Sequence, residues 1–251
     1  MEKALVILSG GMDSCILLHD LAQQKIERRD VFTVVEGPKF ELYAITFNYG
    51  QRIVREIECA KEQAKLAKVK EHKIVNMDFF KDVASKSSLT NSALETPKAR
   101  DDIGNAQPLS YVPFRNLFLL TAAAAWAESN GIERVFYGAV GTDDLSGYWD
   151  CTTPFLEKVN NIYSLNRKHT ILVDAPYMKW TKDRVLKRGL ELGVNLKQTH
   201  TCYEGKEEAC GECVSCAARL QAFIDNKTID PIEYSRNIPW DYFKCKEIGS
   251  A

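Results

Sequence analysis

The chain has 251 residues, of which 45% are hydrophobic and 27% are charged, and its formal net charge is −1. That length suffices for one large domain, or for one domain with a small lobe. The charge balance lacks the basic excess of many nucleic-acid-binding proteins, and no apolar run approaches the roughly 20 residues of a membrane-spanning helix. The N-terminus shows no signal-peptide pattern. We therefore expect a cytoplasmic protein with no membrane partner and no direct nucleic-acid partner.

The first predicted strand, Ala4–Leu8, leads into Ser9-Gly10-Gly11-Met12-Asp13-Ser14 and then into a helical pattern over Ser14–Gln24. A strand, a glycine turn and a helix start make an anion site, because the glycines admit phosphate oxygens to the backbone amides and the helix start adds unpaired N–H groups. Asp13 suits a Mg²⁺-bridging role or a helix cap better than direct phosphate contact. The alternative is an ordinary glycine turn that caps a helix.

The rest of the chain alternates apolar, β-rich runs with helical patterns. Further strands are predicted over Leu42–Phe47, His72–Val75, Arg134–Tyr137 and Thr170–Val173. Further helices are predicted over Arg52–Ala67, Arg115–Ser129, Pro154–Asn166, Lys182–Leu192 and Val214–Ile224. This alternation predicts an α/β fold, a five-stranded parallel sheet with helices on both faces, whose ligands bind at the carboxyl ends of the strands.

Two stretches interrupt that alternation. Lys25–Lys39 is polar and ends in Gly-Pro, so we expect a surface excursion before the second strand. Ser85–Tyr111 is rich in Ser, Asn, Pro and charge, and loops of this length are usually functional or mobile. The second stretch could supply a lid that shields a reactive species from water.

Polar and aromatic residues gather where predicted strands end. The second strand ends in Phe47-Asn48-Tyr49-Gly50-Gln51, and Arg115 and Asn116 open a later helix. The segment after the fourth strand carries Asp144, Ser146, Tyr148 and Asp150, a set suited to stacking on and hydrogen bonding with a flat heterocycle. Lys182, at a helix start, could reach a pyrophosphate. The alternatives without a function are ordinary turn residues at the end of the second strand, a solvated acidic loop after the fourth strand, and a solvated Lys182.

Four of the eight cysteines are clustered, as Cys202, Cys210, Cys213 and Cys216. Four thiolates at this spacing predict a closed, structural Zn²⁺ site with no open coordination position. An iron–sulfur cluster, a redox pair and buried unliganded cysteines are the alternatives. His200 lies close enough in sequence to compete as a ligand, but we expect it to be a polar neighbour.

The glycine loop resembles the PP-loop of ATP pyrophosphatases, and the motifs together resemble the 7-cyano-7-deazaguanine synthase (QueC) family. They are L-S-G-G-M-D-S from Leu8, F-N-Y-G-Q-R from Phe47, V-P-x-R-N from Val112, D-x-S-G-Y-x-D-C from Asp144, T-K at Thr181, and the C-Y…C-G-x-C-x-x-C run from Cys202, followed by Arg219. The resemblance implies a HUP-like PP-loop (adenine nucleotide α hydrolase) fold with a small zinc lobe built on the four clustered cysteines. We expect a catalytic domain over residues 1–196, a zinc lobe and helix over 197–225, and a tail over 226–251.

The resemblance also implies the chemistry. Family members take 7-carboxy-7-deazaguanine, ATP with Mg²⁺, and ammonia; an acyl-adenylate forms, ammonia converts it to an amide, and a second ATP drives loss of AMP to give the nitrile. Asp13, Ser14, Arg115 and Lys182 would be catalytic. ATP would bind Leu8, Ser9, Gly10, Gly11, Met12, Asp13, Ser14, Phe47, Gln51 and Arg115, and the deazaguanine would bind Tyr49, Asn116, Asp144, Ser146, Tyr148 and Asp150. A homodimer is also expected.

This chain departs from the family pattern at two positions. Phe114 stands where the family usually has Gly, and Trp149 stands where it usually has Pro. Bulky residues beside the site bear on the acceptor of the activated acid. The second interpretation is therefore a QueC-like paralogue of the bacterial antiphage-defence type, which couples the acid to a protein amine. A third is a catalytically silent nucleotide-binding partner protein.

Overall fold

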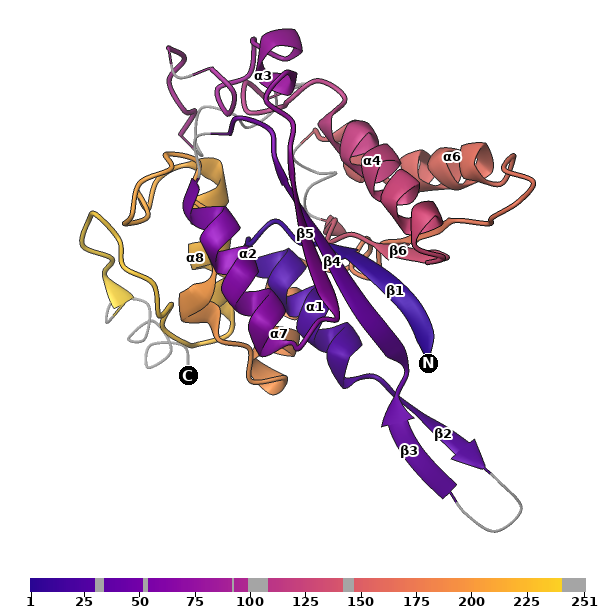
Figure 1. The fold of residues 1–251 in the computed structure, drawn as a ribbon. Coiled ribbons are helices and arrows are strands. Elements are labelled where there is room, and N and C mark those ends of the chain that lie inside the picture. The colour runs from indigo at the N-terminus through magenta and orange to yellow at the C-terminus, as the bar shows by residue number, and fades with distance from the viewer. Residues whose placement is uncertain (30–33, 52–53, 92, 99–107, 142–146, 241–251) are drawn as a thin grey trace.

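The computed structural model describes residues 1–29, 34–51, 54–91, 93–98, 108–141 and 147–240. Its centre is a five-stranded sheet in the order β5-β4-β1-β6-β7 (Figure 1). Every pair of neighbours in this sheet is parallel. The strands are β1 (Glu2–Ile7), β4 (Phe40–Asn48), β5 (Glu71–Asn76), β6 (Arg134–Phe136) and β7 (Leu172–Asp174). The predicted parallel five-stranded sheet is thus confirmed.

Helices cover both faces of the sheet (Figure 1). One face carries α1 (Met12–Gln23), α2 (Val54–Leu66), α7 (Lys182–Glu191) and α8 (Val214–Asp225), the other carries α4 (Arg115–Ser129) and α6 (Thr153–Tyr163), and a short α3 (Phe80–Val83) follows β5. Along β1, Ala4 and Val6 belong to one hydrophobic cluster and Leu5 to the other. Successive side chains of a strand point to opposite faces, so a strand buried on both faces must be apolar throughout.

The polar excursion over Lys25–Lys39 is an ordered hairpin. Strands β2 (Lys25–Arg29) and β3 (Val34–Pro38) pair antiparallel, from Lys25 opposite Pro38 to Arg29 opposite Val34. In Figure 1 the hairpin extends away from the sheet and its helices. The sequence did not predict these strands because the run is strongly charged and contains no hairpin dipeptide such as Asn-Gly.

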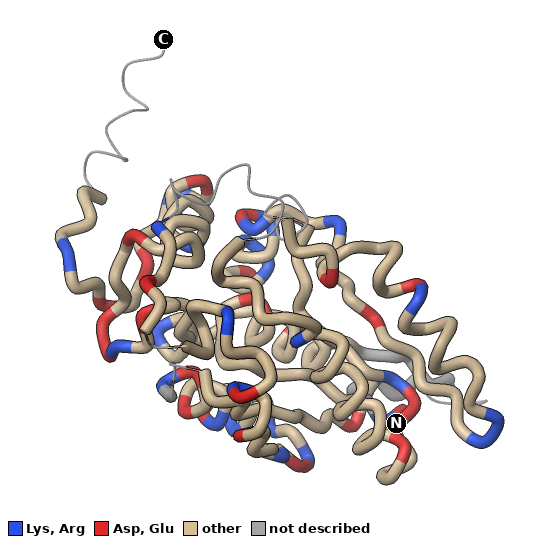
Figure 2. The backbone as a smooth tube through the Cα atoms, turned by 90° about the horizontal axis from the view of Figure 1, so that it is seen from above, with Lys and Arg blue, Asp and Glu red and all other residues tan. Residues whose placement is uncertain are grey.

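The described parts of the predicted lid, residues 85–91, 93–98 and 108–111, are turns and bends rather than regular elements. An isolated bridge joins Lys98 to Cys213, so this stretch contacts the cysteine-rich lobe. Figure 2 shows basic and acidic residues interspersed along the backbone. Among the described residues, none of the helices has the length and apolar character that crossing a bilayer requires.

Candidate active site and metal centre

A cavity of about 250 Å³ lies where β1, β4 and β6 end. Parallel strands bring their carboxyl ends to one edge, which is why motifs far apart in the sequence meet here. Most of the predicted site residues line it: Leu8, Ser9, Gly11, Asp13, Ser14, Phe47, Tyr49, Gln51, Arg115, Asn116, Tyr148 and Lys182. The structure therefore brings the glycine loop, the end of β4 and the start of α4 around one space.

Hydroxyl groups fold the glycine loop onto itself. The Ser9 and Ser14 hydroxyls lie 3.0 Å apart, Ser14 Oγ donates to the Gly11 carbonyl at 3.1 Å, and Ser9 Oγ accepts from the Gly11 amide at 3.2 Å. Helix α1 follows Gly11 with no side-chain cap. The two serines therefore hold the shape of the turn, and the unpaired amides at the start of α1 remain for an anion.

Gly10 is required by packing as well as by its backbone angle. Its φ is +88°, and a Cβ atom added there would lie 1.9 Å from the Glu56 carbonyl oxygen of α2. The expectation that this glycine serves phosphate approach is thus incomplete, because the loop also rests directly on the first turn of α2. A larger residue at position 10 would displace that helix, so a Gly10→Val variant does not report on phosphate binding alone.

Asp13 and Lys182 form an ion pair at the cavity wall. Lys182 Nζ donates to Asp13 Oδ2 at 2.7 Å, and the two side chains are 13% and 17% exposed, respectively. Asp13 Oδ1 is buried and has no hydrogen-bond partner in the described part of the chain. Of the two roles predicted for Asp13, a helix cap is not observed, and the open oxygen fits a cation ligand.

Arg115 enters the cavity from the first turn of α4. Its guanidinium donates to the Tyr49 hydroxyl at 3.2 Å. The preceding residue, Phe114, has φ +55°, in the left-handed region where bulky residues are rare. Phe114 and Trp149 are 55% and 41% exposed, and their ring centroids lie 5.6 Å apart. The two residues that depart from the family pattern therefore contact each other.

Other predicted residues lie elsewhere. The Met12 side chain belongs to the hydrophobic core. Asp150 is 2% exposed and does not line the cavity; burial raises the pKa of its carboxyl, and Arg115 opposes that shift. Asp144 and Ser146 lie outside the described residues.

Sequence reasoning missed several polar residues that line the cavity, among them Glu56, Thr201 and Tyr203. Burial raises the pKa of Glu56 to about 8, with Arg115 opposing the shift and Cys202 adding to it. Glu56 follows the F-N-Y-G-Q-R motif by one helical turn, and this spacing could have identified it as a cavity residue. Thr201 directly precedes the first cluster cysteine.

The four predicted cysteines form one cluster, with all sulfur atoms within 4.8 Å of one another. Cys210 and Cys216 Sγ are 3.9 Å apart, close to the roughly 3.8 Å edge of a tetrahedron with 2.3 Å Zn–S bonds. Backbone amides of Glu204 and Cys210 donate to Cys202 Sγ. Such donors stabilise thiolates, so this group of sulfur atoms could hold a metal ion. His200 is not part of it.

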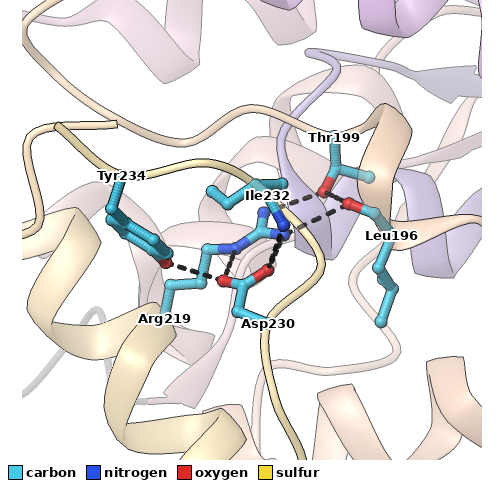
Figure 3. A network of polar contacts seen from close by, with 6 residues as sticks. All are labelled: Leu196, Thr199, Arg219, Asp230, Ile232 and Tyr234. Carbon is cyan, nitrogen blue, oxygen red and sulfur yellow. Dashed lines mark hydrogen bonds and ion pairs between the residues drawn. The ribbon is translucent and has the colours of Figure 1, made fainter. Parts of the chain in front are cut away.

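A fully buried ion pair supports the cysteine lobe (Figure 3). Arg219 Nε and Nη2 donate to the two carboxylate oxygens of Asp230 at 2.5 and 2.9 Å, and both side chains are 0% exposed. Arg219 Nη1 donates to Thr199 Oγ1 at 2.8 Å, and Tyr234 donates to Asp230 at 2.7 Å. This network fixes the segment that leads into Cys202.

The segment from Thr199 to Cys202 connects the cavity with the cysteine cluster. The His200 amide donates to the Gly10 carbonyl at 3.0 Å, Thr201 lines the cavity, and Cys202 belongs to the sulfur cluster. Burial lowers the pKa of His200 to about 4, so its ring is neutral near pH 7. The candidate metal centre is therefore adjacent in sequence to His200, whose amide contacts the glycine loop.

Comparisons with known proteins identify relatives of this chain. A family model described as "Queuosine biosynthesis protein QueC" matches residues 3–227. A 7-cyano-7-deazaguanine synthase from Oceanobacillus iheyensis is 40% identical over 235 residues, covering 93% of this chain and 98% of that protein. Another, from Acidobacterium capsulatum, is 39% identical over 239 residues, covering 93% and 97%. The solved U34-tRNA thiolase NcsA from Methanococcus maripaludis, which carries a 4Fe–4S cluster, aligns with a TM-score of 0.48 and 20% identity over 90% of this chain and 65% of that one.

Proposed function

The chain belongs to the QueC family, which supports a role in queuosine biosynthesis, and we propose on that basis that it converts 7-carboxy-7-deazaguanine to 7-cyano-7-deazaguanine. ATP activates the acid as an acyl-adenylate, ammonia displaces AMP to give the amide, and a second activation gives the nitrile. The observation that carries this proposal is the cavity itself, where the glycine loop, the Lys182–Asp13 pair and Arg115 surround one space.

The nucleotide end of the proposed site is the glycine loop. Amides at the start of α1 receive phosphate oxygens, and Lys182 and Arg115 supply positive charge as pyrophosphate leaves. Asp13 would hold Mg²⁺ that arrives with ATP, because its Oδ1 is buried and lacks a partner among the described residues. Bound there, the ion would neutralise charge on the phosphates.

The heterocycle end lies between β4 and α4. Tyr49, Asn116 and Tyr148 line the cavity there and offer ring faces, an amide and hydroxyl groups. Asn116 Nδ2 donates to Cys151 Sγ at 3.4 Å, which orients the amide. Leu89, from the predicted lid, also lines the cavity and would help to exclude water from the adenylate.

For the cysteine cluster we propose structural zinc. All four sulfur atoms fit around one ion, whereas a cubane of four irons and four sulfides would hold the thiolates farther apart. A site with four thiolate ligands has no vacancy for catalysis. Metal analysis of purified protein should find about one zinc per chain, and iron with visible absorbance would contradict this proposal.

The exposed Phe114–Trp149 pair favours a second candidate function, coupling of the activated acid to a protein amine. Aromatic residues are enriched at protein–protein interfaces, and the two rings of this pair are exposed and in contact. The direct test is mass spectrometry of products formed from 7-carboxy-7-deazaguanine, ATP and ammonium. A free nitrile supports the synthase. An amide with no nitrile, together with a deazaguanine adduct on an added protein, supports the second candidate, and no AMP from any substrate refutes both.

A further inference from the structure

Glu56 lines the cavity and takes no part in the proposed contacts to the nucleotide or the heterocycle. Among the described residues, two acidic residues line the cavity, Asp13 and Glu56. Lys182 pairs with Asp13, but within the described ranges no hydrogen bond or ion pair holds the Glu56 carboxylate. A partly buried carboxylate without a partner is costly, so its presence beside a reaction space calls for a chemical reason.

The backbone fixes the position of Glu56. The first turn of α2 rests against the glycine loop, since a Cβ on Gly10 would collide with the Glu56 carbonyl. From that turn Glu56 lines the same cavity as Arg115 of α4 and Thr201. Glu56 and the glycine loop, the place proposed for the phosphates, therefore border the same cavity.

We infer that Glu56 is a catalytic base that accepts the proton lost by the nitrogen nucleophile during amide formation, an inference that rests on the proposed function. The ammonia lone pair forms the C–N bond while the carbonyl π pair moves to oxygen. The N–H proton passes to a Glu56 carboxylate oxygen. The oxyanion then re-forms the carbonyl, AMP leaves with the electron pair of the broken C–O bond, and the Glu56 carboxyl returns its proton to solvent.

The surroundings of Glu56 suit this role. A carboxylate with an ordinary pKa near 4.3 is a weak base for a nitrogen proton. Burial raises the pKa of Glu56 to about 8, Cys202 adds to the shift, and Arg115 opposes it. In the part of the wall that the structure describes, the other charged side chains, Asp13 and Lys182, pair with each other.

The test separates adenylation from amide formation in the metal-loaded enzyme. Exchange of labelled pyrophosphate into ATP, with the deazaguanine acid and without ammonium, reports on adenylation. In Glu56→Gln we expect this exchange to persist while amide formation with ammonium falls by about 100-fold or more. Glu58→Gln, an exposed position on the same helix, is the matched control and should leave both rates unchanged. With hydroxylamine in place of ammonia, Glu56→Gln should lose less rate, because the attached nitrogen of the less basic nucleophile gives up its proton more readily.

A second measurement needs no variant. At constant free ammonia, the wild-type amide-forming rate should fall as the pH drops through about 8. A flat profile, or amide formation by Glu56→Gln at the wild-type rate, overturns the inference. So does a loss of exchange equal to the loss of amide, particularly with an altered Mg²⁺ dependence, because Glu56 would then serve the nucleotide. Wild-type enzyme without exchange refutes the proposed function instead.

Discussion

Two ion pairs in this molecule differ in how completely hydrogen bonds satisfy their carboxylate oxygens. Arg219 and Asp230 are fully buried, and the Asp230 oxygens also accept from Tyr234 and the Ile232 amide. Lys182 and Asp13 are partly exposed, and one Asp13 oxygen is buried without a partner among the described residues. Burial of a charge is tolerated where hydrogen bonds satisfy it. The first pair therefore stabilises the fold, whereas the second leaves an acceptor open for a ligand.

The largest expected effect on stability comes from breaking the satisfied pair. Asp230→Ala leaves the Arg219 guanidinium buried without its counter-charge, and we expect the free energy of unfolding to fall by about 3–5 kcal/mol. Urea denaturation measures this. Asp225→Ala, on the exposed end of α8, is the control and should stay within about 0.5 kcal/mol of wild type. Equal stabilities for the two variants would remove the distinction between the pairs.

The same substitution at the other pair should spare the fold. Asp13→Ala should change the free energy of unfolding by about 1 kcal/mol or less, because the substitution also removes a buried oxygen that has no partner among the described residues. Adenylation, measured by pyrophosphate release, should fall by about 100- to 1000-fold, because phosphate charge loses its organised partners. Wild-type pyrophosphate release in this variant would show that the open oxygen has no part in the reaction.

A smaller effect is expected at Phe114, where the backbone is strained. Phe114→Gly and Phe114→Ala both remove the contact with Trp149, so their difference isolates the left-handed backbone. The Gly variant should unfold with a free energy about 1 kcal/mol higher than that of the Ala variant. Thermal or chemical denaturation of the two proteins decides this, and equal values would mean that the backbone relaxes at this position.

The smallest effect concerns pH. His19 Nε2 lies 2.8 Å from Gln63 Oε1, and burial lowers the pKa of His19 below its usual value. The unfolded chain therefore takes up a proton first as the pH falls. Stability should be complete above about pH 6.5 and should decline below it. His19→Gln should flatten that decline, and an unchanged slope would assign it to other groups.

The sequence predicted the sheet because its strands are buried on both faces and must be apolar. It predicted the start of α4 at Arg115 and the cysteine cluster because each is marked by a short, continuous stretch of sequence. It did not distinguish Glu56 from Glu58 or Glu62 on the same helix, because only the approach of Gly10 to α2 makes one glutamate a cavity residue. Met12 shows the converse limit, since a position inside a motif can still face the core.

The contacts that hold the segment from Thr199 to Cys202 affect how it opens locally. Four consecutive residues are tied to Arg219, to Gly10, to the cavity and to the sulfur cluster. The segment cannot swing out without breaking hydrogen bonds on both sides, so it should exchange its amide hydrogens as one cooperative unit. The His200 amide would then be protected in the metal-loaded protein and would exchange faster after chelation. Loss of the metal would therefore increase local opening beside the glycine loop, although the metal site has no open coordination position for catalysis.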